Sequence, residues 1–246
     1  MCVIWAKIEM QNEQTIEFSY TFKFPDGAEK SFDVRLDAET GESLLPIPAE
    51  LPDWTLLDCN RCSHCPLNSV EHPRCPAAVS IIDVIETFRE VASIQPVEVH
   101  VTSPQRQTSK DGVPLPAAMG ALIGARLAAS GCPITAKFQP MVRHHLPFAT
   151  FEEAAYRMVS MHALAQLLRM KAGLEPDWEL KELNQLCEDV NTLNMDFARR
   201  LRDLHVNDST TNALSGLDSF VQMVDLSVDD DLLDNLKKLF SAHLEA

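Results

Sequence analysis

The first fifty residues alternate between apolar and polar side chains, which is the pattern of half-buried β-strands. In the stretch TIEFSYTFKF, residues 15–24, every second residue from Ile16 onward is apolar. A Pro-Asp-Gly turn follows, and residues 32–36 resume the alternation, as expected for an antiparallel hairpin. Residues 3–8 have the composition of a third strand, which a marginally stable hairpin needs. The sequence therefore predicts an antiparallel β module over residues 1–53.

Residues 77–149 contain both helical and strand-like periodicity. Apolar residues recur at helical spacing over residues 79–88, and valines alternate over residues 97–101 as in a strand. The polar stretch 103–114 is expected to be a loop. It leads to a helix rich in small residues, 117–128, whose glycines favour the close approach of another backbone. We therefore expect a mixed α/β core in this region.

The chain is expected to be helical from residue 150 onward. Thr150 and Glu153 have the spacing of a capping box, which marks a helix start. One face of this helix is predicted to be buried and consists of Phe151, Ala154, Met158, His162, Ala165 and Leu168.

A second, more regular apolar stripe covers residues 180–204 at three- and four-residue spacing. Phe197 lies at its centre and is predicted to be buried, and Asn194 is a polar residue within the stripe that would fix the helix register. Two shorter helices are expected over residues 213–224 and 229–243. Because short connections favour antiparallel neighbours, residues 150–246 are predicted to form a helical bundle, and the whole chain an α+β fold.

Four of the seven cysteines fall within residues 54–76, in the order Cys59-x2-Cys62-x2-Cys65-x9-Cys75. Thiolates two residues apart in a tight turn can bind one tetrahedral ion, so this segment predicts a metal site. The simplest occupant is zinc, held by four thiolates or by three and an imidazole from His64 or His72. A C-x2-C-x2-C run also begins ferredoxin motifs, so an iron–sulfur cluster is the alternative, although the last gap is nine residues instead of three. A third interpretation stays open, in which the cysteines pack as small apolar side chains without metal.

Five short motifs accompany these cysteines: CSHCPL (62–67), CPAA (75–78), SGCP (130–133), HLPF (145–148) and PDW (176–178). Together they resemble an uncharacterised family of bacterial proteins that share a domain of unknown function. The resemblance spans residues 54–214 and implies no known activity, substrate or partner. The family pattern has no counterpart of Cys59. The resemblance therefore implies Cys62, Cys65, Cys75 and Cys132 as the ligands, with Cys59 competing for the fourth position.

The charge is unevenly distributed along the chain. The net charge is −15, yet residues 99–151, which we call the basic island, contain five Lys or Arg residues and one acid. Arg106, Arg143 and His145 of this island are candidates for a pocket that binds a cofactor or small anion. Arginine binds anions through paired hydrogen bonds, and histidine can act as acid, base or ligand near neutral pH. The alternative is that each of them pairs separately with acids of the flanking segments.

Three other sets of residues are expected to have structural roles only. His162, on an apolar helix face, is expected to be a hydrogen-bonded core histidine, and Cys187 a packed side chain in the stripe. Arg199, Arg200 and Arg202 are expected on a solvated helix face.

The composition of the chain argues against several classes of function. The acidity of the chain argues against binding to nucleic acid or anionic lipid. The most apolar stretch, AAMGALIGARLAASG, is too short to span a bilayer, so no membrane location is expected. The first residues, MCVIWAKIEM, lack the apolar run of a signal peptide, which predicts a cytoplasmic protein with reduced thiols.

No phosphate loop, dinucleotide fingerprint, G-x-S-x-G or H-E-x-x-H motif is present, so the sequence indicates no particular reaction and leaves open whether the protein is an enzyme. We expect a cytoplasmic metal-binding accessory or binding protein whose partner is an unknown protein or a small anion. The alternative is a metal-dependent or iron–sulfur enzyme or redox protein that uses a pocket near Arg106, Arg143 and His145.

Overall fold

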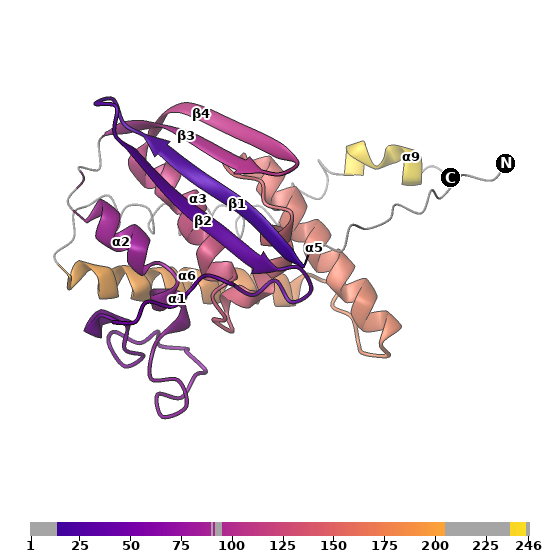
Figure 1. The fold of residues 1–246 in the computed structure, drawn as a ribbon. Coiled ribbons are helices and arrows are strands. Elements are labelled where there is room, and N and C mark those ends of the chain that lie inside the picture. The colour runs from indigo at the N-terminus through magenta and orange to yellow at the C-terminus, as the bar shows by residue number, and fades with distance from the viewer. Residues whose placement is uncertain (1–13, 90, 92–94, 205–236, 245–246) are drawn as a thin grey trace.

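The computed structural model describes residues 14–89, 91, 95–204 and 237–244 (Figure 1). The predicted strand at 3–8 and the predicted helix at 213–224 lie outside these residues, as does most of the helix predicted at 229–243. The short helix α9 (Ser241–Leu244) overlaps the end of that last prediction.

One antiparallel sheet contains four strands in the order β2-β1-β3-β4. The strands are β1 (Thr15–Lys23), β2 (Glu29–Asp37), β3 (Pro96–Ser103) and β4 (Arg106–Pro114). The hairpin of β1 and β2 and the strand at 97–101 are as predicted. The pairing of β1 with β3 joins the predicted 1–53 module to the predicted 77–149 region, so the strand pairing crosses the boundary at residue 53.

Strand β4 corrects the expectation of a loop over residues 103–114. Ser103 pairs with Arg106 across a two-residue turn, and β4 continues beside β3 at the edge of the sheet. Val113 alone among its nine residues is buried, so the strand carries no alternating apolar pattern. Backbone pairing forms this strand, and its polar side chains suit an exposed edge.

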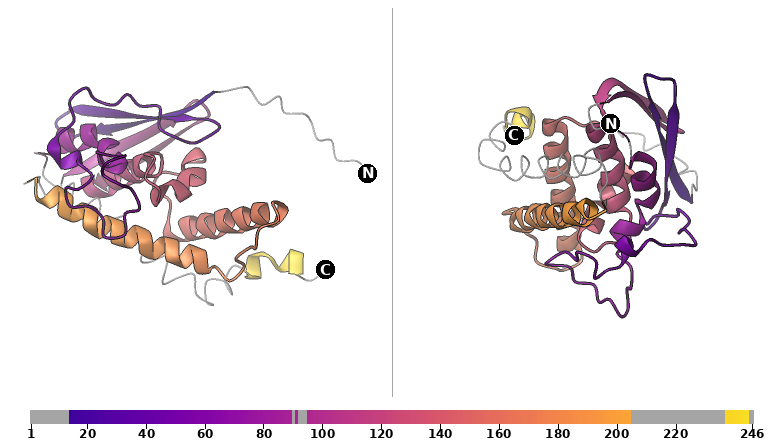
Figure 2. Two further views of the ribbon diagram at one scale, coloured as in Figure 1. Left: turned by 90° about the horizontal axis from the view of Figure 1, so that it is seen from below. Right: turned by 90° about the vertical axis from the view of Figure 1, so that its left-hand side faces the viewer.

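The buried face of the sheet follows from the alternation in β1 and β2. Tyr20 lies opposite Phe32 and Phe18 opposite Val34, and all four side chains are buried. Helices cover this face, while the other face is open, as both views in Figure 2 show. The helices are α1 (Pro76–Val79), α2 (Ile82–Phe88), α3 (Leu115–Ala128), α4 (Gln139–Arg143), α5 (Phe151–Lys171) and α6 (Lys181–Arg202), with 3-10 turns at Asp53–Thr55 and Thr135–Phe138.

The central helix α3 is tied to its neighbours by a buried arginine. Arg126 donates hydrogen bonds to the carbonyl oxygen of Asp33 on β2 (2.9 Å), to that of Ser80 (3.1 Å) and to the carboxylate of Asp83 on α2 (2.6 Å). A charged side chain can be buried in this way because several acceptors replace its water shell.

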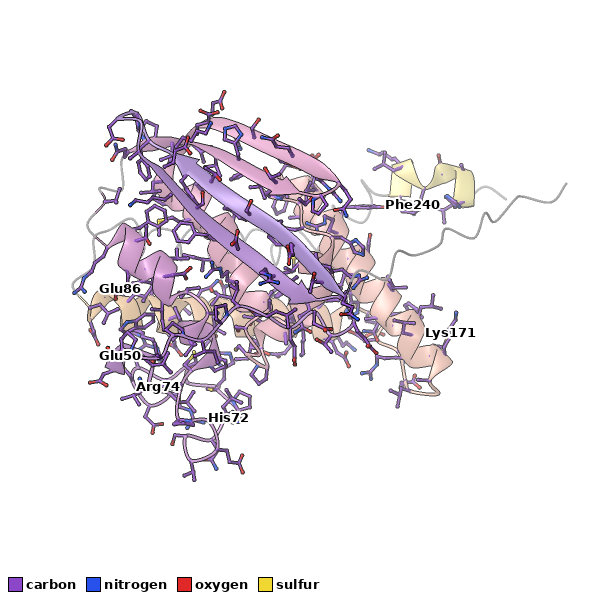
Figure 3. All side chains as sticks on the ribbon, viewed as in Figure 1. Glu50, His72, Arg74, Glu86, Lys171 and Phe240 are labelled. Atoms are coloured by element: carbon purple, nitrogen blue, oxygen red, sulfur yellow. The ribbon has the colours of Figure 1, made fainter. Side chains whose placement is uncertain are left out.

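Helix α5 begins as predicted, because Thr150 and Glu153 form both hydrogen bonds of a capping box. Its predicted buried face is correct in its first half only. Met158 and His162 are buried, but Leu168 is 58% exposed and Ala165 is also exposed, while Gln166 is buried instead. The far end of α5, marked by Lys171 in Figure 3, extends away from the sheet, so fewer neighbours are available to cover it.

Helix α6 confirms the predicted apolar stripe. Leu183, Cys187, Val190, Phe197 and Leu201 are buried, and Phe197 is 1% exposed. These side chains join the same hydrophobic core as the sheet and helices α1–α3. The α+β fold is therefore as predicted. In the part of the chain that the structure describes, no helix is long and apolar enough to cross a membrane.

Candidate functional site

The four clustered cysteines lie on or beside one irregular loop, residues 56–75, which we call the cysteine loop. An isolated bridge between Leu56 and Arg74 closes its base, and turns occupy much of the remainder, without helix or strand. The backbone N–H of Cys65 donates to the carbonyl oxygen of Cys62 (3.0 Å), which forms the tight turn expected for a C-x2-C pair. In Figure 3 the labelled Arg74 and His72 mark this loop, at the opposite side of the molecule from Lys171.

Arginine side chains organise the cysteine loop from within. Arg61 donates to the carbonyl oxygen of Cys65 (2.9 Å), and Arg74 donates to that of Pro52 (2.6 Å). Backbone carbonyl groups outside helices and sheets need other partners, and guanidinium groups supply several N–H donors each. These bonds hold the loop in one shape although it lacks regular secondary structure.

Arg200 of α6 is the main connection between the loop and the helical body. Its side chain is 1% exposed. One terminal nitrogen, Nη1, donates to the carbonyl oxygens of Trp54 (2.9 Å) and Leu56 (2.8 Å), and Nη2 donates to that of Leu57 (3.3 Å). The expectation that Arg200 lies on a solvated face is therefore wrong, because three carbonyl groups at the base of the loop replace water around it.

Asp196, one helical turn before Arg200, makes the second connection. Its carboxylate is 4% exposed and accepts hydrogen bonds from the backbone N–H (2.7 Å) and hydroxyl (3.1 Å) of Ser63. Residues four apart lie on the same side of a helix, so both side chains meet the loop. Arg199 pairs with Asp196 but is 61% exposed, and Arg202 is exposed, so these two arginines are placed as predicted.

Four thiols from two distant segments lie near one another and near Arg200. Cys62, Cys65 and the buried Cys75 belong to the cysteine loop, and Cys132 is buried shortly after α3. Burial, followed by the charges of Cys75, Cys132 and Cys65, raises the pKa of Cys62 to about 12. Burial also raises the pKa of Cys75, and the positive charge of Arg200 opposes that rise. The four thiols are thus close enough to influence one another electrostatically.

These four cysteines are the ligand set that the family resemblance implied. Cys59 is half-buried and is not among the groups that shift the pKa of Cys62 or Cys75. His64, within the loop, has both ring nitrogens buried without a hydrogen-bond partner, whereas His72 is exposed. Buried imidazole nitrogens normally have partners, so His64 fits a ligand position that His72 does not.

The cysteine cluster is not arranged as a closed coordination shell. Among the described residues, no group of three Cys, His, Asp or Glu side chains is placed to hold an ion as it stands. Binding one would require loop side chains to rotate toward Cys75 and Cys132. Cys62 and Cys65, the two loop cysteines that would have to rotate, are half-buried.

The three candidates from the basic island meet elsewhere, at a pocket of about 450 Å³. It lies where β1 begins and where β3 turns into β4. Its walls are formed by Thr15, Ile16, Glu17, Phe18, Val101, Ser103, Pro104, Gln105, Arg106, Thr108, Arg143, His144, His145 and Pro147. The structure therefore brings Arg106, Arg143 and His145 together, and none of the described residues that line this pocket is a cysteine.

His145 is held against the aromatic residues of β1. Its Nε2 is hydrogen-bonded to the hydroxyl of Tyr20, and its ring stacks on Phe18 with 4.7 Å between the centroids and 16° between the planes. Burial, and then the charges of Arg157 and Arg106, lower the pKa of His145 to about 4. Burial also raises the pKa of Tyr20, so both groups are neutral at pH 7.

Two further arginine contacts fix the segment that carries His145. Arg157 of α5 donates to the carbonyl oxygens of Met141 and His144, each at 2.8 Å. Arg143 donates to the carbonyl oxygen of Ala38, just after β2. His162 is a hydrogen-bonded core histidine, as predicted, with its Nε2 at 3.0 Å from the carbonyl oxygen of Asp177.

Several residues of both sites were not predicted from the sequence. For Arg200 a signal existed, because it lies three residues after the buried Phe197 and so falls on the apolar side of α6. Asp196 falls on the same side. For Tyr20 and Arg157 no local signal existed, because Tyr20 lies 125 residues from His145 in the chain and Arg157 acts on the pocket from another helix.

Comparison with known proteins gives one match. The family model described as a domain of unknown function (DUF6901) matches residues 18–241. This confirms the resemblance to an uncharacterised domain family and extends it to the first strands of the sheet. No curated protein matches, and no solved structure matches.

Proposed function

The chain belongs to the DUF6901 family, which is defined by a domain of unknown function, and we propose from the residues of this chain that the protein is a metal-binding accessory protein. One zinc ion binds to Cys62, Cys65, Cys75 and Cys132 and fixes the cysteine loop to the helical body. The observation that carries this proposal is the meeting of three thiols of the cysteine loop with Cys132, which lies 57 residues after Cys75 in the chain.

The chemistry of the group favours a cation. Four neighbouring thiols cannot all ionise without a counter-charge, because each thiolate raises the pKa of the next. Arg200 provides one positive charge but is already committed to three backbone carbonyl oxygens. A tetrahedral, thiolate-preferring ion such as zinc would neutralise the group and release the thiol protons.

Three residues are candidates for the fourth ligand, and we propose Cys132. Cys132 is buried and close enough to Cys62 and Cys75 to affect the pKa of both. His64 has two buried ring nitrogens without partners, which makes it the leading competitor. Cys59 has neither property. We therefore assign Cys132 as the fourth ligand.

Such an ion would have a structural role. The cysteine loop has no helix or strand, and its tip is exposed, with Val70 88% exposed. A metal held by Cys62, Cys65, Cys75 and Cys132 would cross-link the loop to the edge of the hydrophobic core, against which all four side chains pack, so metal binding would stabilise folding. The exposed part of the loop would then be held as a surface for a protein partner. An ion bound by four protein ligands has no open position, which favours this role over metal catalysis.

Cobalt substitution tests the ligand set. Co²⁺ in a tetrahedral thiolate site absorbs strongly in the visible region and in the near ultraviolet, where its intensity reports the number of thiolates. We expect these bands in the wild-type protein after Co²⁺ is added to the metal-free chain. They should be reduced in Cys75→Ser and Cys132→Ser and unchanged in Cys59→Ser. Cys187→Ser, which changes a buried cysteine in α6, is the matched control.

Two outcomes contradict the proposal. Bands of full intensity in Cys75→Ser would show that Co²⁺ binds elsewhere. Loss of the bands in His64→Ala but not in Cys132→Ser would replace Cys132 by His64 as the fourth ligand.

A further inference from the structure

The residues that line the pocket at the end of the sheet take no part in the proposed metal site. Two arginines, Arg106 and Arg143, line it. The protein as a whole has 36 acidic and 21 basic residues, so most basic residues have acids available to pair with. Among the described residues, no carboxylate forms an ion pair with either of these two arginines, although eight other Lys or Arg residues form such pairs.

Glu17, the one acid among the described residues of the wall, does not neutralise them. Glu17 pairs with Arg35 on the neighbouring strand, with 2.9 Å between its Oε1 and the arginine Nε. Alternation along β1 directs the side chain of Glu17 to the face opposite Phe18. Among the described residues, the positive charge of Arg106 and Arg143 is therefore not balanced by a carboxylate on the pocket side. Arg157, which is hydrogen-bonded to the carbonyl oxygen of the lining residue His144, adds to it.

The remaining walls are of two kinds. Ile16, Phe18 and Val101 form an apolar side, continuous with the core. Ser103 and Thr108 also line the pocket, and the Ser103 hydroxyl donates to the carbonyl oxygen of Arg106 (3.3 Å). An apolar wall combined with a few charged and hydroxyl groups is typical of sites for small organic ligands, and the volume of about 450 Å³ is in the usual range.

His145 adds a neutral polar group to this site. Its Nε2 is engaged by the hydroxyl of Tyr20, and its ring is fixed by stacking on Phe18. If the buried Tyr20 hydroxyl donates to Nε2, the tautomer of the neutral ring carries its proton on Nδ1. The imidazole is then a fixed hydrogen-bond donor that contributes no charge of its own at neutral pH.

We propose that this pocket binds a small organic anion. Its carboxylate or phosphate group contacts Arg106 and Arg143, and its apolar part lies along Ile16 and Phe18. Arginine forms paired, charge-assisted hydrogen bonds with both kinds of oxyanion. The site contains no cysteine among its described lining residues, so the proposal is independent of the metal site.

Calorimetric titration with simple probes tests the proposal. Phenyl phosphate and phenylacetate each combine an aromatic ring with an oxyanion, inorganic phosphate has the charge alone, and benzyl alcohol has the ring alone. We expect saturable binding of at least one aromatic anion, at least tenfold tighter than inorganic phosphate. Benzyl alcohol should not bind measurably. The tighter of the two aromatic anions identifies the preferred head group.

Charge-removing variants locate the binding site. Arg106→Gln is the main variant, because Arg106 is exposed and its guanidinium donates no hydrogen bond to the backbone of the described residues. The substitution should therefore leave the fold intact. It should weaken binding of the aromatic anion at least tenfold, and Arg143→Gln should do the same. Arg89→Gln is the matched control, since Arg89 is a half-exposed arginine on a different part of the surface, 3.9 Å from Glu86. It should leave the affinity unchanged.

Three results would overturn the proposal. They are binding of equal strength in wild type and Arg106→Gln, equal binding of benzyl alcohol and the aromatic anions, and no binding of either aromatic anion at millimolar concentration. Equal binding of inorganic phosphate and the aromatic anions would disprove the role of the apolar wall. Circular dichroism spectra of the variants establish that each is folded before titration.

Discussion

Removing the guanidinium group of Arg200 should destabilise the protein strongly. Arg200→Met keeps an unbranched apolar stem, although a shorter one, and deletes all three hydrogen bonds to the carbonyl oxygens of Trp54, Leu56 and Leu57. The carbonyl groups of Trp54 and Leu57 then lose this partner in a site that water reaches poorly, since Arg200 is 1% exposed, whereas that of Leu56 keeps the N–H of Cys59 as a donor (3.1 Å).

The magnitude follows from the number and type of these bonds. A hydrogen bond to a charged group contributes about 1.5–3 kcal/mol, and a buried carbonyl left without a partner costs about 1–3 kcal/mol. The three bonds share one guanidinium and are not additive. The desolvation of the arginine itself also offsets part of their contribution. We therefore expect Arg200→Met to lower the free energy of unfolding by about 3–4 kcal/mol.

Urea unfolding measures this loss, and the assay is best done with a chelator present, so that metal binding does not contribute. Arg202→Met is the matched control, because Arg202 is exposed on the same helix two residues later. It should change the free energy of unfolding by less than about 0.5 kcal/mol. Arg200→Lys keeps the charge without the forked geometry and should fall between the two.

A loss of less than 1 kcal/mol in Arg200→Met would contradict the described role of Arg200 in holding the loop. An equal loss in Arg202→Met would show that the effect belongs to α6 in general.

Two further predictions concern the core and the basic pocket. Phe197→Ala should lower the free energy of unfolding by about 3–5 kcal/mol, because Phe197 is 1% exposed. Leu168→Ala should change the free energy of unfolding little, because Leu168 is 58% exposed. Equal losses of the two variants in urea unfolding would contradict the assigned helix faces. The pKa of His145 is about 4 in the folded protein and about 6.5 in the unfolded chain, so at intermediate pH the unfolded chain binds a proton that the folded protein does not. The free energy of unfolding should therefore fall as the pH drops below about 6.5. Between pH 7.5 and pH 5 this contribution is at most about 2 kcal/mol, and His145→Phe should remove it; the same pH dependence in both proteins would argue against a neutral His145.

The sequence pattern predicted the elements whose side chains are buried on one face. The hairpin of β1 and β2 and the stripe centred on Phe197 are examples, because burial imposes a period on the sequence. Strand β4 escaped prediction since only Val113 of its residues is buried, and an edge strand needs no such period. The second half of α5 was predicted wrongly for the opposite reason, because Leu168 continues the period where no neighbour covers it.

The sites depend on contacts between distant segments, which periodicity does not reveal. Cys132 was placed with Cys62, Cys65 and Cys75 by the family resemblance and not by spacing. The spacing of Arg106 and His145 in the sequence did not show that they share a pocket. Two contacts bring them together: β3 pairs with β4, and Arg157 fixes the segment 141–145.

The metal content of the protein purified without oxygen shows whether the four cysteines hold a zinc ion. Elemental analysis combined with an absorption spectrum should find about one zinc ion per chain and no visible absorption. Cys62→Ser and Cys65→Ser should each lose the zinc, and Cys187→Ser should retain it. A wild-type protein without zinc, or full zinc occupancy in Cys65→Ser, would contradict the claim, and a brown protein with iron and sulfide would replace zinc by an iron–sulfur cluster.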